Sequence, residues 1–208
     1  MERTNDTITL CGRVTGAPEL SHTGKEGEYY RFPLTVKRLS GTEDTLNIIV
    51  RGEFTEYLRR SESCRLRVTG EVRSYNNRSG IGPRLVITVF ARSLEFTDDD
   101  YENSVSLTGT ICKAPNLRST PMGREICDIM LAVNRRYGKS DYLPCIAWGA
   151  LARESSSWPV GTRIRLTGRM QSRVYIKSEN GISTENVAFE ISAVTMAPVC
   201  GEENADSF

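Results

Sequence analysis

An internal repeat constrains this chain of 208 residues more than any other feature of its sequence. At least twelve positions between Leu10 and Gly52 recur as the same residue type 97 positions later, between Leu107 and Gly149. Glycines and prolines, which restrict backbone geometry, belong to the recurring set. A constant offset over more than forty residues predicts two copies of one small domain, and it argues against a single large fold.

The length fits two domains of roughly 100 residues each. We expect a first domain over residues 1–97, an acidic junction over 98–102, a second domain over 103–197 and an acidic C-terminal segment over 198–208. Lys and Arg exceed Asp and Glu by three over residues 1–96 and by five over 103–197. Two basic bodies joined and followed by acidic segments suit a polyanionic partner, although a solvated surface tolerates the same charges.

Apolar residues alternate with polar ones along five segments of each repeat, which is the period of a β-strand. In the second repeat these segments lie near residues 105–111, 129–133, 143–147, 164–170 and 187–193, with a helix-like stretch at 150–155. The first repeat follows the same order. Five short strands with one short helix after the third predict an all-β chain of two tandem five-stranded OB-fold barrels.

Glycines and turn residues support barrels of this size. Gly12, Gly70, Gly109 and Gly168 interrupt strand patterns, where glycine usually marks a bulge or a sharp bend. We therefore expect the strands to bend at these positions, as a small closed barrel requires.

The sequence gives no indication of catalysis, metal binding or membrane insertion. No apolar run approaches the roughly 18 residues of a membrane span, so we expect a cytoplasmic protein. The six cysteines form no C-x-x-C pair and only one histidine, His22, accompanies them, so zinc is not expected. No grouping of nucleophile, base and carboxylate is recognisable. We predict a protein that is not an enzyme and needs no cofactor.

Strand alternation sorts the side chains of the second repeat into inner and outer sets. If Leu143 points into the barrel, then Tyr142 and Trp148 point out of it. Arg169 and Arg173 fall on the outer side by the same rule. Rings set among cations suit single-stranded nucleic acid, because bases stack on the rings and cations follow the phosphates. The alternative is that Tyr142 and Trp148 pack against a partner subunit or the other repeat.

At these positions the sequence resembles the bacterial single-stranded DNA-binding protein family. The resemblance spans nearly the whole second repeat, and the segments that carry it are Asn103-x-Val105-x-Leu107-x-Gly109, Pro115-x-Leu117-Arg118-x-Thr120-x-x-Gly123, Leu131-Ala132-Val133-Asn134-Arg135, Trp148-Gly149-x-Leu151-Ala152 and Gly168-Arg169-x-x-Ser172-Arg173-x-Tyr175. It implies that single-stranded DNA winds over the OB folds. The expected contact residues of this repeat are Tyr137, Tyr142, Trp148, Tyr175, Arg118, Arg135, Arg136, Arg169 and Arg173.

The first repeat resembles the family less closely. Thr45, Arg51 and Asn77 stand where the second repeat has Tyr142, Trp148 and Tyr175. We expect a weaker, more electrostatic DNA site here, and the alternative is a surface used mainly for assembly. The expected contact residues are Lys37, Arg38, Arg51, Arg73, Tyr75 and Arg84.

The resemblance further implies an assembly of four OB folds, which for a chain with two folds means a homodimer. It also implies an acidic tip that recruits replication and repair enzymes, here Glu202, Glu203, Asp206 and Phe208, although these residues also fit an ordinary chain end. The sequence as a whole favours protection of single-stranded DNA in replication, recombination or repair. The rival interpretation is an OB-fold adaptor of a replication or primosome complex with weak or no DNA binding.

Overall fold

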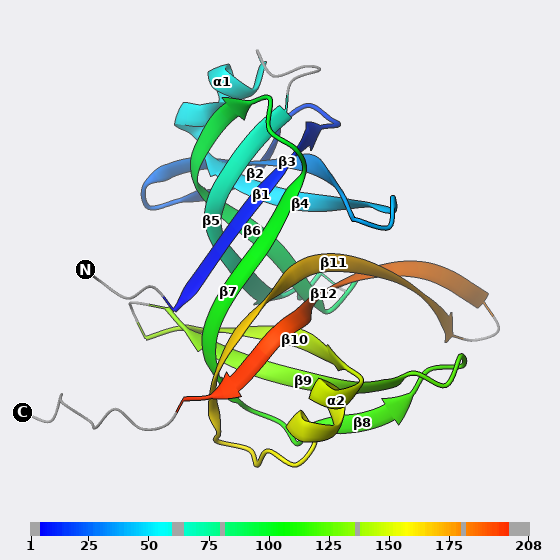
Figure 1. Cartoon of the computed structure of the whole chain (residues 1–208). Helices are drawn as coiled ribbons and strands as arrows, with labels where there is room; N and C mark the ends of the chain where they lie inside the picture. Colours follow the sequence, from blue (N-terminus) through cyan, green and yellow to red (C-terminus); the bar gives the residue numbers. More distant parts are fainter. Residues whose placement is uncertain (1–4, 60–64, 80–81, 136–137, 180–181, 200–208) are drawn as a thin grey trace, which may run out of the picture.

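The computed structural model describes residues 5–59, 65–79, 82–135, 138–179 and 182–199. Strands dominate these ranges, and the helices are short (Figure 1). The elements in chain order are β1 (Asp6–Val14), β2 (Glu19–Gly24), β3 (Gly27–Lys37), β4 (Glu43–Arg51), a single 3₁₀ turn (Gly52–Phe54), α1 (Thr55–Arg59), β5 (Arg65–Asn76), β6 (Leu85–Thr97), β7 (Glu102–Ile111), β8 (Asn116–Ser119), β9 (Glu125–Asn134), β10 (Ser140–Trp148), α2 (Ala150–Ser155), β11 (Arg163–Glu179) and β12 (Ile182–Pro198).

Each repeat closes into a ring of five hydrogen-bonded strands. In the first repeat the ring runs β1-β3-β4-β6-β5 and returns to β1, and in the second it runs β7-β9-β10-β12-β11 and returns to β7. The β4–β6 and β10–β12 pairs are parallel, and the other pairs within the rings are antiparallel. A helix follows the third strand of each ring. The predicted all-β class with two tandem OB folds is confirmed.

One short strand in each repeat was not predicted. β2 extends the edge of β3, and β8 extends the edge of β9 in the same way. Every residue of β2 and β8 is exposed, so neither strand shows the apolar alternation from which strands are recognised in a sequence. The connection between the repeats is short, since β6 ends at Thr97 and β7 begins at Glu102.

Two of the four glycines, Gly70 and Gly168, stand at irregularities in the strand pairing, as the sequence indicated. The register between β5 and β6 shifts at Gly70, and the register between β11 and β12 shifts at Gly168. A Cβ atom at Gly168 would lie 2.4 Å from the carbonyl oxygen of Ser192, and one at Gly70 would lie 2.1 Å from that of Phe90. Only glycine lets the two strands approach this closely at the bend.

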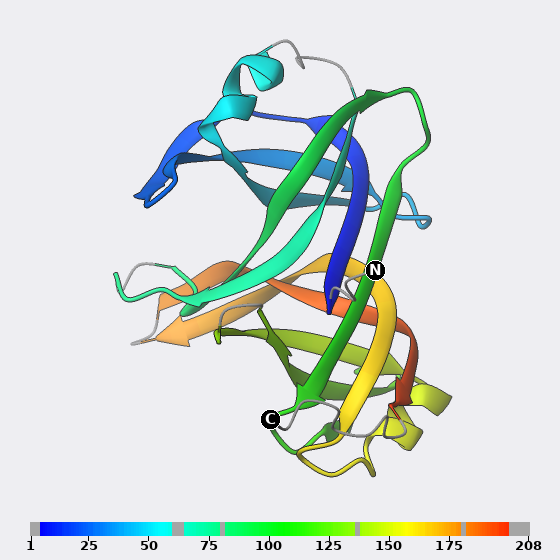
Figure 2. The same cartoon turned by 90° about the vertical axis from the view of Figure 1, so that its left-hand side faces the viewer.

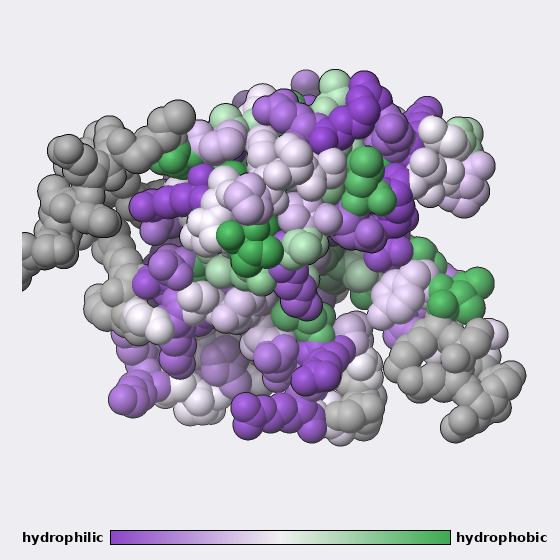
Figure 3. Space-filling view, turned by 90° about the horizontal axis from the view of Figure 1, so that it is seen from below, coloured by the Kyte–Doolittle hydropathy of each residue, from purple (hydrophilic) through white to green (hydrophobic). Residues whose placement is uncertain are grey.

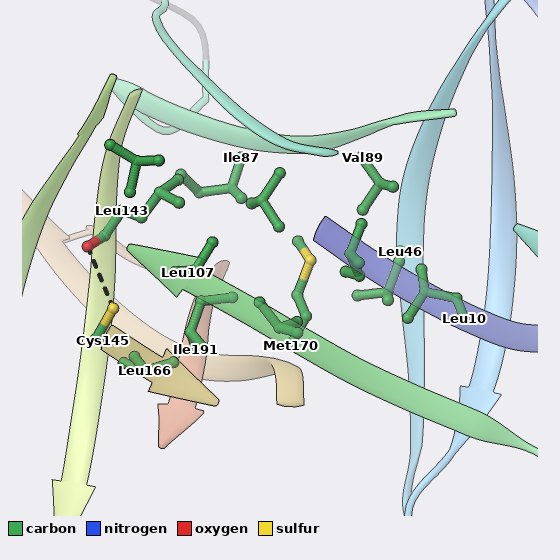
Figure 4. Packing of buried hydrophobic residues seen from close by; sticks show 14 of the residues in the cluster. Leu10, Leu46, Ile87, Val89, Leu107, Leu143, Cys145, Leu166, Met170 and Ile191 are labelled. Atoms are coloured by element: carbon green, nitrogen blue, oxygen red, sulfur yellow. Dashed lines mark hydrogen bonds between the residues drawn. The ribbon is translucent and has the colours of Figure 1, made fainter. Parts of the chain in front are cut away.

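The inward side chains of both rings form one continuous core. Leu143, Cys145 and Ala147 point inward as alternation predicted, and each is at most 3% exposed. Buried residues of both repeats belong to a single cluster, which contains Leu10 and Val89 of the first repeat together with Leu107 and Met170 of the second (Figure 4). The two repeats therefore pack as one body.

Antiparallel pairing of β1 with β7 joins the two rings edge to edge (Figure 1 and, from the side, Figure 2). Ile8 lies opposite Val105 in this pairing. These two residues are also equivalent in the repeat, because they are 97 positions apart. An approximate two-fold axis therefore passes between Ile8 and Val105 and relates the two barrels, as a closed pair of like domains requires.

Two reciprocal polar clusters flank this axis. In one, the Asp44 carboxylate accepts hydrogen bonds from Nε and Nη2 of Arg38, both at 2.6 Å, and from the backbone N–H of Ser172 at 2.8 Å. In the other, the Asp141 carboxylate accepts from Nε and Nη2 of Arg135 at 2.7 and 2.5 Å and from the N–H of Ser74 at 2.6 Å. Each cluster thus joins a hairpin of one repeat to a strand of the other.

The carboxylates of these clusters are buried and charged. The Asp44 and Asp141 side chains are 1% and 0% exposed. Burial alone would raise the pKa of Asp141, but the hydrogen bonds from Arg135, from the N–H of Ser74 and from Arg73 outweigh it and hold the pKa below its ordinary value. The buried charge is therefore compensated from both repeats.

A third pair of equivalent residues breaks the symmetry of the repeats. Asn103 donates through Nδ2 to the carbonyl of Met170 at 2.6 Å and accepts through Oδ1 from its N–H at 2.9 Å. Asp6 occupies the equivalent place, and its Oδ1 accepts from the N–H of Val72 at 3.0 Å. Its Oδ2 is buried and has no hydrogen-bond partner among the described residues. Burial raises the pKa of Asp6 to about 7.

This raised pKa predicts a pH-dependent stability. The folded protein keeps the Asp6 proton up to a pKa of about 7, whereas the unfolded chain releases it near 3.8. The free energy of unfolding should therefore fall as the pH rises from about 4 to about 7, by up to ~1.4 kcal/mol per pH unit. Asp6→Asn should remove this dependence and be more stable than the parent at pH 7, as urea denaturation across that pH range will measure.

Asn103→Asp is the matched control for this experiment. It places the same carboxylate in the second repeat, so its stability at pH 7 should change in the opposite direction to that of Asp6→Asn. Equal unfolding free energies for Asp6→Asn and the parent at every pH would refute the role given to the proton.

Candidate nucleic-acid interface

The outer face of the second barrel is formed by β9, β10, β12 and β11 in that order. Tyr142 and Trp148 lie on the outer side of β10, and they are 49% and 38% exposed. Ile146 lies between them on the same side but is only 3% exposed, so neighbouring side chains cover it. Exposed hydrophobic residues form small separate groups on the largely hydrophilic surface of Figure 3. Tyr142 and Trp148 therefore stand exposed on the outer side of β10.

Hydrogen bonds hold both of these residues in place. The indole Nε1 of Trp148 donates to Oγ of Ser192 on β12 at 3.1 Å, which fixes the ring across the neighbouring strand. The backbone N–H of Tyr142 donates to Oγ of Ser74 at 2.7 Å, and Ser74 belongs to the first repeat. A ring whose position is fixed loses little conformational entropy when a ligand stacks on it.

Cations lie beside these rings on β11. Arg169 is exposed and pairs across the sheet with Ser192, the residue that binds the Trp148 indole. The guanidinium of Arg173 lies 5.8 Å from the centroid of the Tyr175 ring, within the range of a cation–π contact. Alternation places Arg169, Arg173 and Tyr175 on the same side of β11. Rings and guanidinium groups therefore share one face of one sheet.

Two carboxylates lie beside the arginines of this face, and the sequence analysis did not include them. Glu190 of β12 accepts from Nε2 of Gln171 at 3.2 Å and lies 3.4 Å from Nε of Arg173. Asp128 of β9 binds Arg118 through two hydrogen bonds of 2.5 and 3.0 Å, and this pairing raises the pKa of Arg118. Arg118 and Arg173 thus have acidic partners, and a phosphate would have to compete with them.

Three arginines assigned to DNA contact have a different environment from the one expected. Arg38 and Arg135 bind the buried carboxylates of the inter-repeat clusters, and Nη1 of Arg73 lies 3.0 Å from the Asp141 carboxylate. Arg73 also contacts Glu71. These side chains hold the repeats together, and releasing one would leave a buried charge unpaired. Of these ion pairs only that of Arg73 with Asp141 joins the two repeats, and the expected role of all three arginines in binding DNA stays a prediction.

Four other expected contact residues of the first repeat lie within the described residues. Lys37, Tyr75 and Arg84 are exposed, and Arg51 is bound to Glu26 at 2.7 Å. Their role in binding DNA stays a prediction. Arg136, Tyr137 and the C-terminal residues Glu202, Glu203, Asp206 and Phe208 lie outside the described residues.

The first repeat carries a groove of about 980 Å³ on the equivalent face. Tyr29, Tyr75 and Phe90 line it, together with His22 from β2. Sequence reasoning missed Tyr29 and Phe90, although alternation along β3 and β6 places both on the outer side of the barrel. Strand alternation alone indicates that both rings point outward. A comparison of the repeats does not select them, because neither ring occupies a position at which the second repeat has a ring.

No group of three or more His, Cys, Asp or Glu side chains within the described residues is arranged to hold a metal ion. No helix in the described ranges is long and apolar enough to cross a membrane.

Comparison with known proteins decides the family. Residues 102–198 match the sequence model of the single-strand binding protein family. The chain is 32% identical over 88 residues to single-stranded DNA-binding protein B of Bacillus subtilis (strain 168), an alignment that covers 39% of this chain and 77% of that relative. The chain belongs to the single-strand binding protein family. This confirms the resemblance recognised in the second repeat.

Other relatives show how far the likeness extends. Single-stranded DNA-binding protein 2 of Listeria innocua is 32% identical over 84 residues, which is 37% of this chain but only 53% of the relative. The wild-type single-stranded DNA binding protein of Thermus aquaticus superimposes with a TM-score of 0.77 at 20% identity, over 99% of this chain and 98% of that one. The sequence relatives thus match one repeat, whereas the solved structure shares the fold of both.

Proposed function

We propose that the chain binds single-stranded DNA without sequence preference and protects it during replication, recombination or repair. The observation that carries this function is the pair of exposed rings beside guanidinium groups on one face of the second barrel, with the Trp148 ring held by a hydrogen bond to Ser192. In this proposal bases stack on Tyr142, Trp148 and Tyr175, and Arg169 binds the backbone. Stacking uses the π-face that every base has, so no base is preferred.

The family supports this function, since its members found here are named for single-stranded DNA binding. We propose no catalytic role, and a cytoplasmic location beside the chromosome follows from the proposed ligand. The rival function is an adaptor that keeps the OB folds and binds a replication partner instead of DNA. The two differ in whether DNA reaches the Trp148 ring.

Trp148 gives the decisive test of DNA binding. Oligo-dT should quench its fluorescence as bases stack on the indole, and Trp148→Ala should weaken binding by roughly 1–3 kcal/mol. Trp158→Phe is the matched control, because Trp158 packs against the core away from this face. It should keep the parental quenching and affinity. An unchanged fluorescence of the parent on adding oligo-dT would favour the adaptor.

Arg169 tests the phosphate contacts. Arg169→Ala should lower the slope of log affinity against log salt concentration by about 0.7, the contribution of one phosphate on a single strand. Arg163→Ala removes another exposed arginine, the first residue of β11, which lies roughly 20 Å from Arg169 along the strand. A salt titration in which Arg169→Ala keeps the parental slope, or Arg163→Ala loses as much, would contradict the assignment.

We further propose that two chains assemble as a homodimer, which presents four OB folds. Val174, Ile176 and Val187 support it, because they lie on the inner side of the β11–β12 hairpin and are 56%, 73% and 44% exposed. The same side of β11 carries Met170 in the core. A second copy would cover this apolar strip beyond the end of the barrel.

Sedimentation tests the dimer directly. The parent should sediment at about twice its mass of 23.2 kDa, and Ile176→Ser should shift it toward the monomer. Val194→Ser is the control, since Val194 is 56% exposed but lies near the other end of β12. A monomeric parent at micromolar concentration would refute the dimer. Recruitment of replication or repair enzymes by the C-terminal residues stays a prediction from the family resemblance.

A further inference from the structure

The hydrogen bond between Ser74 and Tyr142 links the first repeat to an exposed ring of the second repeat. Oγ of Ser74 accepts from the backbone N–H of Tyr142 at 2.7 Å. Within the described residues, β12 pairs with β10 at Cys145 and Ile146. Tyr142 lies before this paired stretch, and there β5 of the first repeat lies beside β10. A side chain of the first repeat thus satisfies a backbone donor at the outer face of the second.

Ser74 is itself held by the second repeat. Its backbone N–H donates to the Asp141 carboxylate at 2.6 Å, and its carbonyl oxygen accepts from Nη2 of Arg135 at 3.2 Å. The residue is only 7% exposed. Its Oγ is therefore fixed in position relative to β10, and it can act as a rigid acceptor for the N–H of Tyr142.

The equivalent serine of the second repeat makes a different bond. Ser172 and Ser74 are equivalent because each donates its N–H to the buried aspartate of the other repeat. Oγ of Ser172 donates to Asp44 at 2.7 Å. The N–H that Ser74 accepts belongs to Tyr142, whereas Thr45 stands at the equivalent position of the first repeat. One serine therefore binds a carboxylate, and the other binds a backbone donor beside an exposed ring.

Arg73 accounts for this difference. The offset between the two serines is 98, so Arg73 is equivalent to Gln171. Nη1 of Arg73 lies 3.0 Å from the Asp141 carboxylate, which thereby gains a second guanidinium, whereas Gln171 bonds to a carboxylate of β12. A buried carboxylate needs partners for its oxygens, and Arg73 supplies one. The hydroxyl of Ser74 is therefore available to accept from Tyr142.

The bond to the backbone matters for the ring because the ring is exposed. Tyr142 is 49% exposed, so contacts with the protein cover only about half of the residue. The direction of an aromatic side chain follows from the backbone at its own residue, since χ1 takes only a few staggered values. Fixing the N–H of Tyr142 restricts where the ring can point. A restricted ring loses less conformational entropy when a base stacks on it.

We propose that Ser74 is a positioning residue for the Tyr142 ring, through which the first repeat contributes to stacking on the second. The inference rests on the proposed function of the second repeat and adds the residue that orients one of its rings. Ser74 acts through the backbone N–H of Tyr142 and does not itself contact DNA. The first barrel thus has a role in binding that is independent of any ligand on its own outer face.

The test measures binding of oligo-dT by the full chain through the fluorescence of Trp148. Every variant also carries Trp158→Phe, so that Trp148 is the only tryptophan. Ser74→Ala should weaken binding about two- to tenfold, which is the net contribution of one hydrogen bond. The slope of log affinity against log salt concentration should stay parental, because no phosphate contact is lost.

A double-mutant cycle separates positioning from a general structural effect. Tyr142→Leu removes the ring and keeps the backbone N–H, so adding Ser74→Ala to it should cause no further loss of affinity. A merely structural role of Ser74 would weaken binding by the same factor in both backgrounds. Hydrogen exchange of the Tyr142 amide should also be faster in Ser74→Ala than in the parent.

Ser172→Ala is the matched control. It removes the equivalent hydroxyl, so it should lower the free energy of unfolding through Asp44 but keep the parental affinity for oligo-dT. Ser74→Cys keeps the size of the side chain and offers only a weak acceptor, so it should also weaken binding. It gives the same comparison should Ser74→Ala fail to fold.

The outcomes separate this inference from the proposed function. A parental affinity in folded Ser74→Ala, or an equal loss in the Tyr142→Leu background, would overturn the positioning role while quenching of Trp148 upheld DNA binding. An equal loss in Ser172→Ala would overturn it as well, because the effect would then not depend on the bond to Tyr142. A parent whose Trp148 fluorescence is unchanged by oligo-dT would overturn both proposals.

Discussion

The pairing of β1 with β7 and the two buried aspartate clusters beside it determine most of the other features of the molecule. The strand pairing merges the two cores, and the clusters join a hairpin of each repeat to the other repeat. The site depends on this junction as well. Ser74, held by Asp141, binds the backbone of Tyr142, and Asn134 and Lys139 of the second repeat line the groove of the first repeat.

Buried charges at such a junction favour one arrangement more than they add stability. Moving a carboxylate out of water is costly, and the ion pair that compensates it often gives back little more than that cost. A shift in the relative position of the barrels, however, would leave Asp44 and Asp141 buried without the N–H groups of Ser172 and Ser74. A shift of one barrel relative to the other would therefore cost free energy at both clusters. In this way the clusters fix the register of the pairing between β1 and β7.

The sequence predicted what depends on local pattern, and it failed where contacts join distant residues. Alternation was enough to place Leu143 inside and Trp148 outside, because side chains on a strand change sides at every residue. It could not identify β2, where every residue is exposed. Nor could it assign Arg38, since a basic residue looks the same whether it meets a phosphate or closes a cluster with Ser172, 134 residues away.

The two faces were free to diverge because the junction depends on other residues. The arginine and aspartate of each cluster recur at the offset of 97, while the outward pairs Thr45 and Tyr142, and Arg51 and Trp148, differ. The equivalent serines of the junction nevertheless make different hydrogen bonds in the two repeats. Oγ of Ser74 accepts from the N–H of Tyr142, whereas Oγ of Ser172 donates to Asp44 at 2.7 Å. Ser74 thus binds the backbone of Tyr142, whereas the equivalent Ser172 helps to compensate the buried charge of Asp44. The symmetric pair of barrels can therefore carry two different outer faces.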